Sequence, residues 1–161
     1  MTFDNSKTII KLRIRLFFAL VILIAFLILA YFAKVIKFPL LGMSDTVWIL
    51  ILVGLNILIA FLPMFLNYQY IFYSDDNEKI VIRYFTAGIV GGRKNSVEID
   101  KRSFSGYRTE KKLFGAVRSI TLYQHFNEGV ANYPPIYISA LSGEERAKIL
   151  RSLNSYAPPP K

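Results

Sequence analysis

The chain has no cysteine, and its only histidine is His125. The lack of cysteine excludes disulfides, thiolate nucleophiles and cysteine zinc sites, and one imidazole alone cannot build an ordinary zinc centre. Acidic residues are also few, since 11 Asp and Glu stand against 20 Lys and Arg and leave a net charge of +9. The sequence contains no Walker loop, dinucleotide-binding glycine motif or metalloprotease motif. We therefore expect no enzyme activity, no cofactor and no metal site.

The titratable residues that remain give no pattern for acid–base or nucleophilic catalysis. The acidic residues at 75–78 fall in a predicted turn, and those at 144–145 begin a predicted helix. Residues 117–126 alternate as a strand, and this alternation places His125 on the solvent-facing side. The other residues predicted on that side are Ser119, Thr121 and Tyr123. Those predicted on the core side are Ile120, Leu122 and Phe126.

Two long apolar runs dominate the first half of the chain. No charged residue lies between Arg15 and Lys34, a run of 18 residues, or between Asp45 and Asp75, a run of 29 residues. A hydrocarbon core of about 30 Å needs roughly 20 apolar residues in a helix. The shorter run reaches this length with one more turn at each end, because long cationic side chains extend to the headgroups. The sequence predicts a transmembrane helical hairpin, since two buried core helices would dominate a chain of this size.

The predicted membrane helices cover about residues 10–36 and 46–66, within an N-terminal segment of residues 1–67 that starts with a frayed end at 1–6. The link between the helices holds two cations, whereas four precede the first helix: Lys7, Lys11, Arg13 and Arg15. This excess favours an N-terminus inside the cell, and two crossings return the C-terminus to the same side. We expect a multi-pass protein of the inner (cytoplasmic) membrane with both termini cytoplasmic.

Gly54 and Asn56 interrupt the bulky residues of the second run. A small residue lets helices approach closely, and an amide in hydrocarbon needs a hydrogen-bonding partner on a neighbouring helix. Both are candidate helix-packing residues, either against the first helix or against another membrane subunit.

After residue 67 the long runs give way to short alternating segments. Six segments are predicted as strands: 68–73, 79–86, 95–99, 104–109, 117–126 and 136–141. Ser142 and Glu145 then have capping-box spacing and precede an apolar stripe at helical intervals. The residues of that stripe are Ile149, Leu150, Leu153 and Tyr156. Residues 68–156 are therefore predicted to form a small β-barrel or sandwich capped by a C-terminal helix, with a Pro-rich tail at 157–161.

Four stretches of this domain, 79–94, 97–100, 113–115 and 117–123, carry a strand, a glycine turn, a basic hairpin and further strands in a familiar order. That order resembles the bacterial pleckstrin-homology-like (PH-like) domain over about residues 68–156, although 97–100 lacks the family's proline. The resemblance implies an α+β membrane protein in which a transmembrane hairpin precedes a PH-like domain. It also implies a non-catalytic binding module, and it supplies no site residues.

Seven cations fall in or near the predicted loops: Arg93, Lys94, Lys101, Arg102, Arg108, Lys111 and Lys112. In a domain tethered to a bilayer each could contribute about 1 kcal/mol of attraction to anionic headgroups. Backbone N–H groups at Gly91 and Gly92 could add a small anion nest. The alternative, which stays open, is that these cations are solvated loop residues partly neutralised by nearby carboxylates.

We expect the PH-like domain to act as a docking or scaffold module, with the protein a small accessory subunit of a membrane complex. A protein partner would bind an exposed sheet edge or the groove beside the last helix. The alternative is a sensor that binds anionic membrane lipids through the basic loops. Nucleic acid is not an expected partner, because the protein is anchored in a membrane, and the sequence does not predict an oligomeric state.

Overall fold

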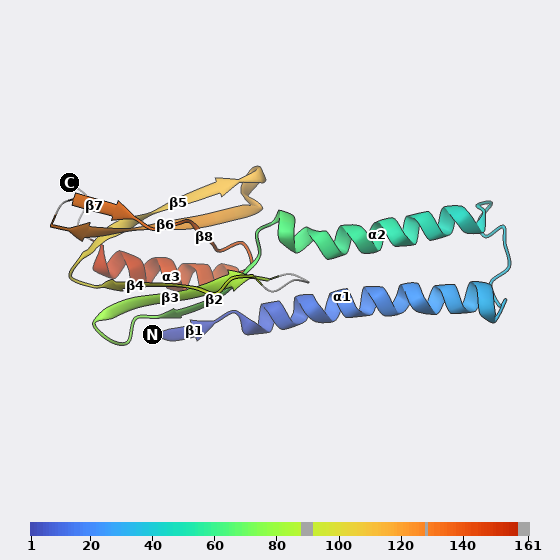
Figure 1. Cartoon of the computed structure of the whole chain (residues 1–161), viewed down its shortest axis with the longest axis horizontal. Helices are drawn as coiled ribbons and strands as arrows, with labels where there is room; N and C mark the ends of the chain where they lie inside the picture. Colours follow the sequence, from blue (N-terminus) through green and yellow to red (C-terminus); the bar gives the residue numbers. More distant parts are fainter. Residues whose placement is uncertain (88–91, 128, 158–161) are drawn as a thin grey trace. The chain divides into compact units, whose positions relative to one another are not determined.

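The computed structural model describes residues 1–87, 92–127 and 129–157 (Figure 1). The chain divides into two compact units, and each is described by itself. Residues Met1–Ile9 and Met64–Lys161 form one unit, here called the β unit, and Ile10–Pro63 form the other, here called the helical unit.

The helical unit contains most of α1 (Ser6–Leu27), the π-helical turn η1 (Ile28–Phe32) and most of α2 (Asp45–Phe65). Both helices are long and apolar enough to cross a membrane. Their large apolar side chains are mostly exposed, for example Phe17 at 63% and Leu50 at 67%, so they do not form a buried protein core.

The first helix begins and ends earlier than the sequence predicts. It begins at Ser6 because the Asn5 carbonyl accepts hydrogen bonds from the backbone N–H groups of Thr8 and Ile9. The cationic flank is therefore part of the helix. The helical backbone ends by Phe32, and Lys34 takes a left-handed conformation with a φ of 52°.

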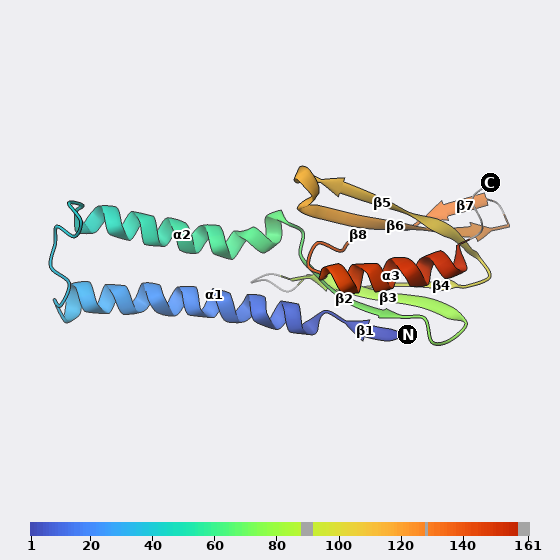
Figure 2. The same ribbon diagram turned by 180° about the vertical axis from the view of Figure 1, so that it is seen from behind.

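The β unit contains two antiparallel sheets (Figure 2). The first has the order β1-β2-β3-β4, from β1 (Thr2–Asp4), β2 (Gln69–Ser74), β3 (Lys79–Thr86) and β4 (Asn95–Asp100). The second has the order β5-β6-β7, with β8 also on β6, from β5 (Phe104–Lys112), β6 (Val117–Phe126), β7 (Gly129–Asn132) and β8 (Ile136–Tyr137). Among the described residues the two sheets do not join into a closed barrel, so of the two predicted forms the structure shows separate sheets.

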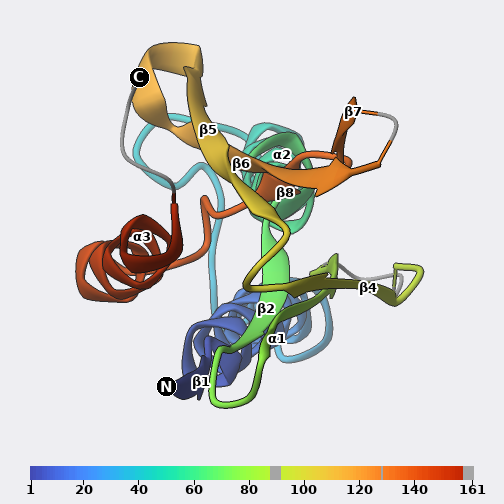
Figure 3. The ribbon, with the colours of Figure 1, turned by 90° about the vertical axis from the view of Figure 1, so that its left-hand side faces the viewer.

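The core lies between the sheets and α3 (Gly143–Tyr156), which lies to one side of both of them in Figure 3. Strand alternation directs Ile71, Ile82 and Leu122 into this core, and α3 adds Ile149 and Leu153. The capping box at the start of α3 is confirmed. The Glu145 N–H donates to Ser142 Oγ over 3.2 Å, and the Ser142 N–H donates to Glu145 Oε2 over 2.7 Å.

The prediction of a frayed N-terminus is wrong. Strand β1 pairs with β2 in the register Phe3↔Tyr73, and Asn5 is completely buried. The Asn5 side chain donates to the Gln69 carbonyl over 3.0 Å and accepts from the Ile71 N–H over 2.9 Å. The amide therefore continues the pairing of β1 with β2 up to the first turn of α1.

Three predictions in the second sheet need correction, and one strand was not predicted. The predicted strand at 136–141 is only two residues long, because the chain turns and the Leu141 N–H donates back to the Ile138 carbonyl. Strand β7 was not predicted, since its four residues are all exposed and show no alternation. On β6, His125 is exposed as expected, but Ser119 is buried where β8 pairs with it, and Phe126 is 48% exposed because the strand runs beyond the core.

Candidate functional site

Only one of the two ends of the β unit carries the connections to the helical unit. At one end the chain leaves for the helical unit after Ile9 and returns at Met64. Ile9 packs there with Ala87 and Ala140 in a small apolar cluster. We call this the exit end. The opposite end, which carries the turn between β2 and β3, is called the far end.

Hydrogen bonds place one end of each sheet at the exit end. The Ala87 N–H donates to the Tyr68 carbonyl over 2.8 Å, which places the end of β3 and the start of β4 there. The Gln69 side chain accepts from the Tyr137 N–H over 2.8 Å and so joins the two sheets. The turn between β5 and β6 lies at the same end, because the Arg118 N–H donates to Ser139 Oγ over 3.0 Å, one residue before Ala140.

Six of the seven cations predicted as contacts are divided between the two ends. Lys101 and Arg102 lie in the turn between β4 and β5 at the far end, and Arg108 lies within β5. The other four lie at the exit end: Arg93, Lys94, Lys111 and Lys112. Gly91 of the predicted anion nest lies outside the described residues.

Several of these cations already have partners. Glu110 lies 3.7 Å from Arg108 Nε and 3.8 Å from Lys112 Nζ, in exposed pairs that contribute little to stability. Lys101 Nζ donates to the Asp75 carbonyl over 2.6 Å and lies 4.5 Å from the centre of the Tyr156 ring. Lys101 thus joins the far-end turns to α3, and its contacts are structural.

Two arginines that the sequence interpretation missed lie beside Lys111. Arg118 on β6 and Arg146 on α3 line a hollow of about 290 Å³ between the β5–β6 hairpin and the first half of α3. Arg118 Nε donates to the Gly115 carbonyl over 2.9 Å, and Arg146 Nη1 donates to the Leu141 carbonyl over 2.6 Å. Partial burial, and next the like charge of Arg118, lower the pKa of Arg146. Since a guanidinium stays protonated, the hollow holds concentrated positive charge.

The sequence did carry a signal for both arginines. Arg118 has the same strand parity as the core residues Ile120 and Leu122, and Arg146 precedes Ile149 and Leu150 by about one helical turn. Each arginine thus takes a position where the local pattern calls for an apolar residue, one in an alternating strand and the other in an amphipathic helix. Such a position indicates a charged group at the edge of the core.

A second, larger hollow of about 420 Å³ lies against the first sheet, where Lys94 meets aromatic side chains. The rings of Tyr70 and Phe85 stack with centroids 4.8 Å apart, and the Arg83 guanidinium lies 5.9 Å from the centre of the Phe72 ring. Both pairs are direct cross-strand partners of β2 and β3, so ordinary sheet packing explains them without a ligand.

A partly buried polar network joins elements at the far end. Asp75 accepts hydrogen bonds from the N-terminal ammonium group and from Ser152 Oγ, and the Tyr73 hydroxyl lies 2.6 Å from Ser152 Oγ. Burial opposes ionisation of Asp75, but these two hydrogen bonds outweigh it, so its pKa is lowered. Burial raises the pKa of Tyr73. The network connects β1, β2 and α3, so it stabilises the fold.

His125 lines a hollow at the far end together with Glu78, Asp100 and Ser103. Its backbone N–H donates to the Ser103 carbonyl over 2.7 Å. Within residues 1–87, 92–127 and 129–157, no three histidine or acidic side chains form a metal-binding group.

The helix-packing candidates lie in the middle of α2. Asn56 Nδ2 donates to the Leu52 carbonyl of its own helix over 2.9 Å, and a Cβ at Gly54 would have no atom within 4 Å. The four topology-setting cations, Lys7, Lys11, Arg13 and Arg15, all lie on α1.

Comparisons with protein-family models, curated proteins and solved structures find no match to the chain. The PH-like assignment therefore stays a prediction. The shown fold is α+β, with two apolar helices and two antiparallel sheets.

Proposed function

We propose that this is a non-catalytic integral membrane protein that presents a PH-like β unit as a docking module for another protein. The observation that carries the proposal is the brevity of both connections to the apolar helices. Only Asn5 separates β1 from α1, and three residues separate α2 from β2. With α1 and α2 in the bilayer, such connections hold the β unit near the membrane and raise its effective concentration for other membrane proteins.

We place the β unit at the cytoplasmic face of the inner membrane, with both termini cytoplasmic. The support is the excess of cations before the first helix over those in the link. In this placement the protein is a small accessory subunit of a membrane complex. It positions a partner at the membrane and catalyses no reaction.

The hollow between β5 and α3 is the docking surface that the geometry supports best. Its three cations are Lys111, Arg118 and Arg146, and Glu110 is its only acidic lining residue among those described. Strand β5 pairs with β6 alone in the described part of the chain, so its other edge can accept a partner strand. The partner that fits is an extended, acidic protein segment, because its carboxylates would relieve the repulsion between the two guanidinium groups.

Anionic-lipid binding through the basic loops is the second candidate. It is favoured by one observation, the presence of four of the seven predicted cations at the exit end. In this alternative, Arg93, Lys94, Lys111 and Lys112 contact headgroups while Lys101 and Arg102 do not.

Purification of the full chain from native membranes in mild detergent tests the docking proposal. We expect a stoichiometric protein partner that is lost in the Arg118→Glu/Arg146→Glu variant. The matched control is Lys79→Glu/Arg102→Glu, which reverses two exposed cations at the far end and should keep the partner. A chain that purifies alone and binds anionic vesicles would contradict docking and favour the lipid alternative.

A further inference from the structure

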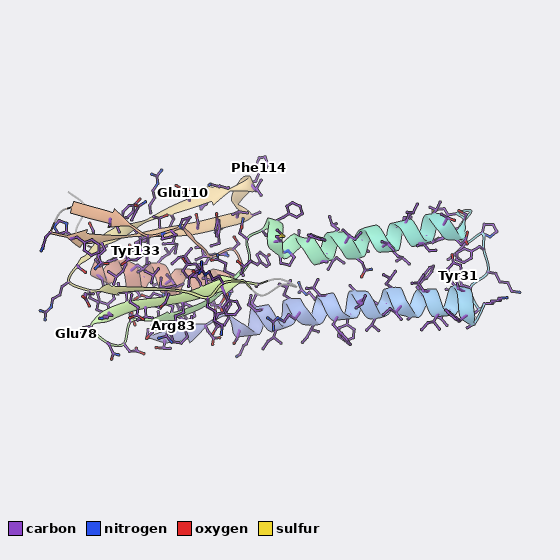
Figure 4. All side chains as sticks on the ribbon, viewed as in Figure 1. Tyr31, Glu78, Arg83, Glu110, Phe114 and Tyr133 are labelled. Carbon is purple, nitrogen blue, oxygen red and sulfur yellow. The ribbon has the colours of Figure 1, made fainter. Side chains whose placement is uncertain are left out.

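The turn between β5 and β6 presents two large apolar side chains to solvent. Leu113 is 62% exposed and Phe114 is fully exposed. Both have left-handed backbone conformations, with φ values of 49° and 54°, which bulky residues rarely adopt. Phe114 projects away from the turn in Figure 4. The backbone therefore holds these side chains outward at the cost of local strain, a pattern that is concentrated at functional sites.

Cations stand on both sides of this turn. Lys111 and Lys112 precede it, and Arg118 follows it on β6. Turns that face only water normally carry glycine, asparagine, aspartate or serine, and this turn has Gly115 but places Leu113 and Phe114 at its tip. An apolar tip flanked by cations fits a lipid interface instead, since the apolar groups enter the acyl boundary while the cations contact phosphates.

The turn also lies at the end of the β unit where the chain continues into the apolar helices. Arg118 is hydrogen-bonded to Ser139, and the next residue, Ala140, packs with Ile9. Ile9 is the last residue of the β unit before α1 continues in the helical unit. If α1 and α2 cross the bilayer, the surface nearest to this point of the chain is lipid.

We infer that Leu113 and Phe114 insert into the lipid interface, with Lys111 and Lys112 against anionic headgroups, and so fix the orientation of the β unit on the membrane. This inference rests on the proposed transmembrane placement of α1 and α2. It adds a third point of attachment, far in sequence from the two helices.

Tryptophan quenching in the full chain tests this inference, because Trp48 is the only tryptophan. The reporter variant is Trp48→Phe/Phe114→Trp, reconstituted in vesicles of phosphatidylcholine and phosphatidylglycerol that carry acyl chains brominated near the headgroup. The matched control is Trp48→Phe/Phe126→Trp, which places the new indole at the far end, where Phe126 is 48% exposed. We expect several-fold stronger bromolipid quenching of the indole at 114 than at 126, and weaker quenching after Lys111→Glu/Lys112→Glu. Trp48→Phe/Leu113→Trp is a second reporter that should also be quenched.

The unaltered chain separates the two ways in which the test can fail. If Trp48 itself is not quenched by bromolipid, the transmembrane placement fails and the inference falls with it. If Trp48 is quenched but both turn reporters stay accessible to aqueous iodide, only the inference is overturned. Protection of the turn reporters from iodide and bromolipid alike would assign the turn to a contact with protein, such as a second copy, and would also overturn it.

Discussion

The far end and the exit end of the β unit differ in how far their charged and aromatic side chains are exposed to solvent. At the far end Asp75 is buried among hydrogen-bond donors, and Lys101 is bound to a backbone carbonyl and an aromatic ring. At the exit end Lys111 contacts no carboxylate among the described residues, and Phe114 is fully exposed. These far-end groups are satisfied within the fold, whereas Lys111 and Phe114 at the exit end are exposed.

Truncation of one apolar side chain at each end should give the largest difference in the free energy of unfolding. Leu153 in α3 is completely buried, so Leu153→Ala should lower the free energy of unfolding by about 2–5 kcal/mol through lost burial and a residual cavity. Phe114→Ala should change it by less than about 0.5 kcal/mol, because the ring makes no core contact. Urea unfolding of the full chain in detergent, monitored by tyrosine fluorescence, measures both. Equal losses would show that Phe114 packs against protein and would remove the contrast.

Acid should destabilise the fold by weakening the hydrogen bonds of Asp75 at the far end. The pKa of Asp75 is lowered in the folded state, so its ionised form stabilises the fold above the carboxyl's ordinary pKa of about 4, and this contribution is lost as the pH falls through the lower, folded-state pKa. We expect the urea midpoint to fall below about pH 4 in the unaltered chain. The Asp75→Asn variant should have a lower midpoint at pH 7 and a flatter pH dependence. If the urea midpoint of this variant depends on pH as strongly as that of the unaltered chain, other carboxylates determine the loss of stability in acid.

The sequence predicted those parts of the fold whose signal is local. Strands 79–86 and 117–126 have the bounds that alternation predicts, and the capping box of α3 forms as its spacing requires. Strand β1 could not be predicted, because three residues have no periodicity and their stability comes from pairing with a distant strand. The closure of a barrel was likewise undetermined, since it depends on contacts between sheets.

The candidate site was predicted only in part, for a similar reason. The loop cations were recognised one by one, but their division between two ends follows from sheet register, which no single loop reveals. Arg118 and Arg146 lie on elements far apart in the sequence, and only the packing of α3 brings them to one hollow. Phe114 was placed within a family pattern, and its full exposure depends on the left-handed backbone of the turn.

Loss of the helix cap at the exit end should have a small effect on stability and a specific effect on the site. Ser142→Ala removes the acceptor for the Glu145 N–H and should lower the free energy of unfolding by about 1 kcal/mol. Ser142→Asp keeps an acceptor at this position and should restore most of that loss. Because the Ser142 carbonyl also receives the Arg146 N–H, fraying of this turn displaces Arg146 from the hollow. Urea midpoints measure the stability change, and recovery of the co-purifying partner measures the second effect. Partner loss in Ser142→Ala with recovery in Ser142→Asp supports a site that depends on the position of Arg146, whereas full retention in Ser142→Ala contradicts it.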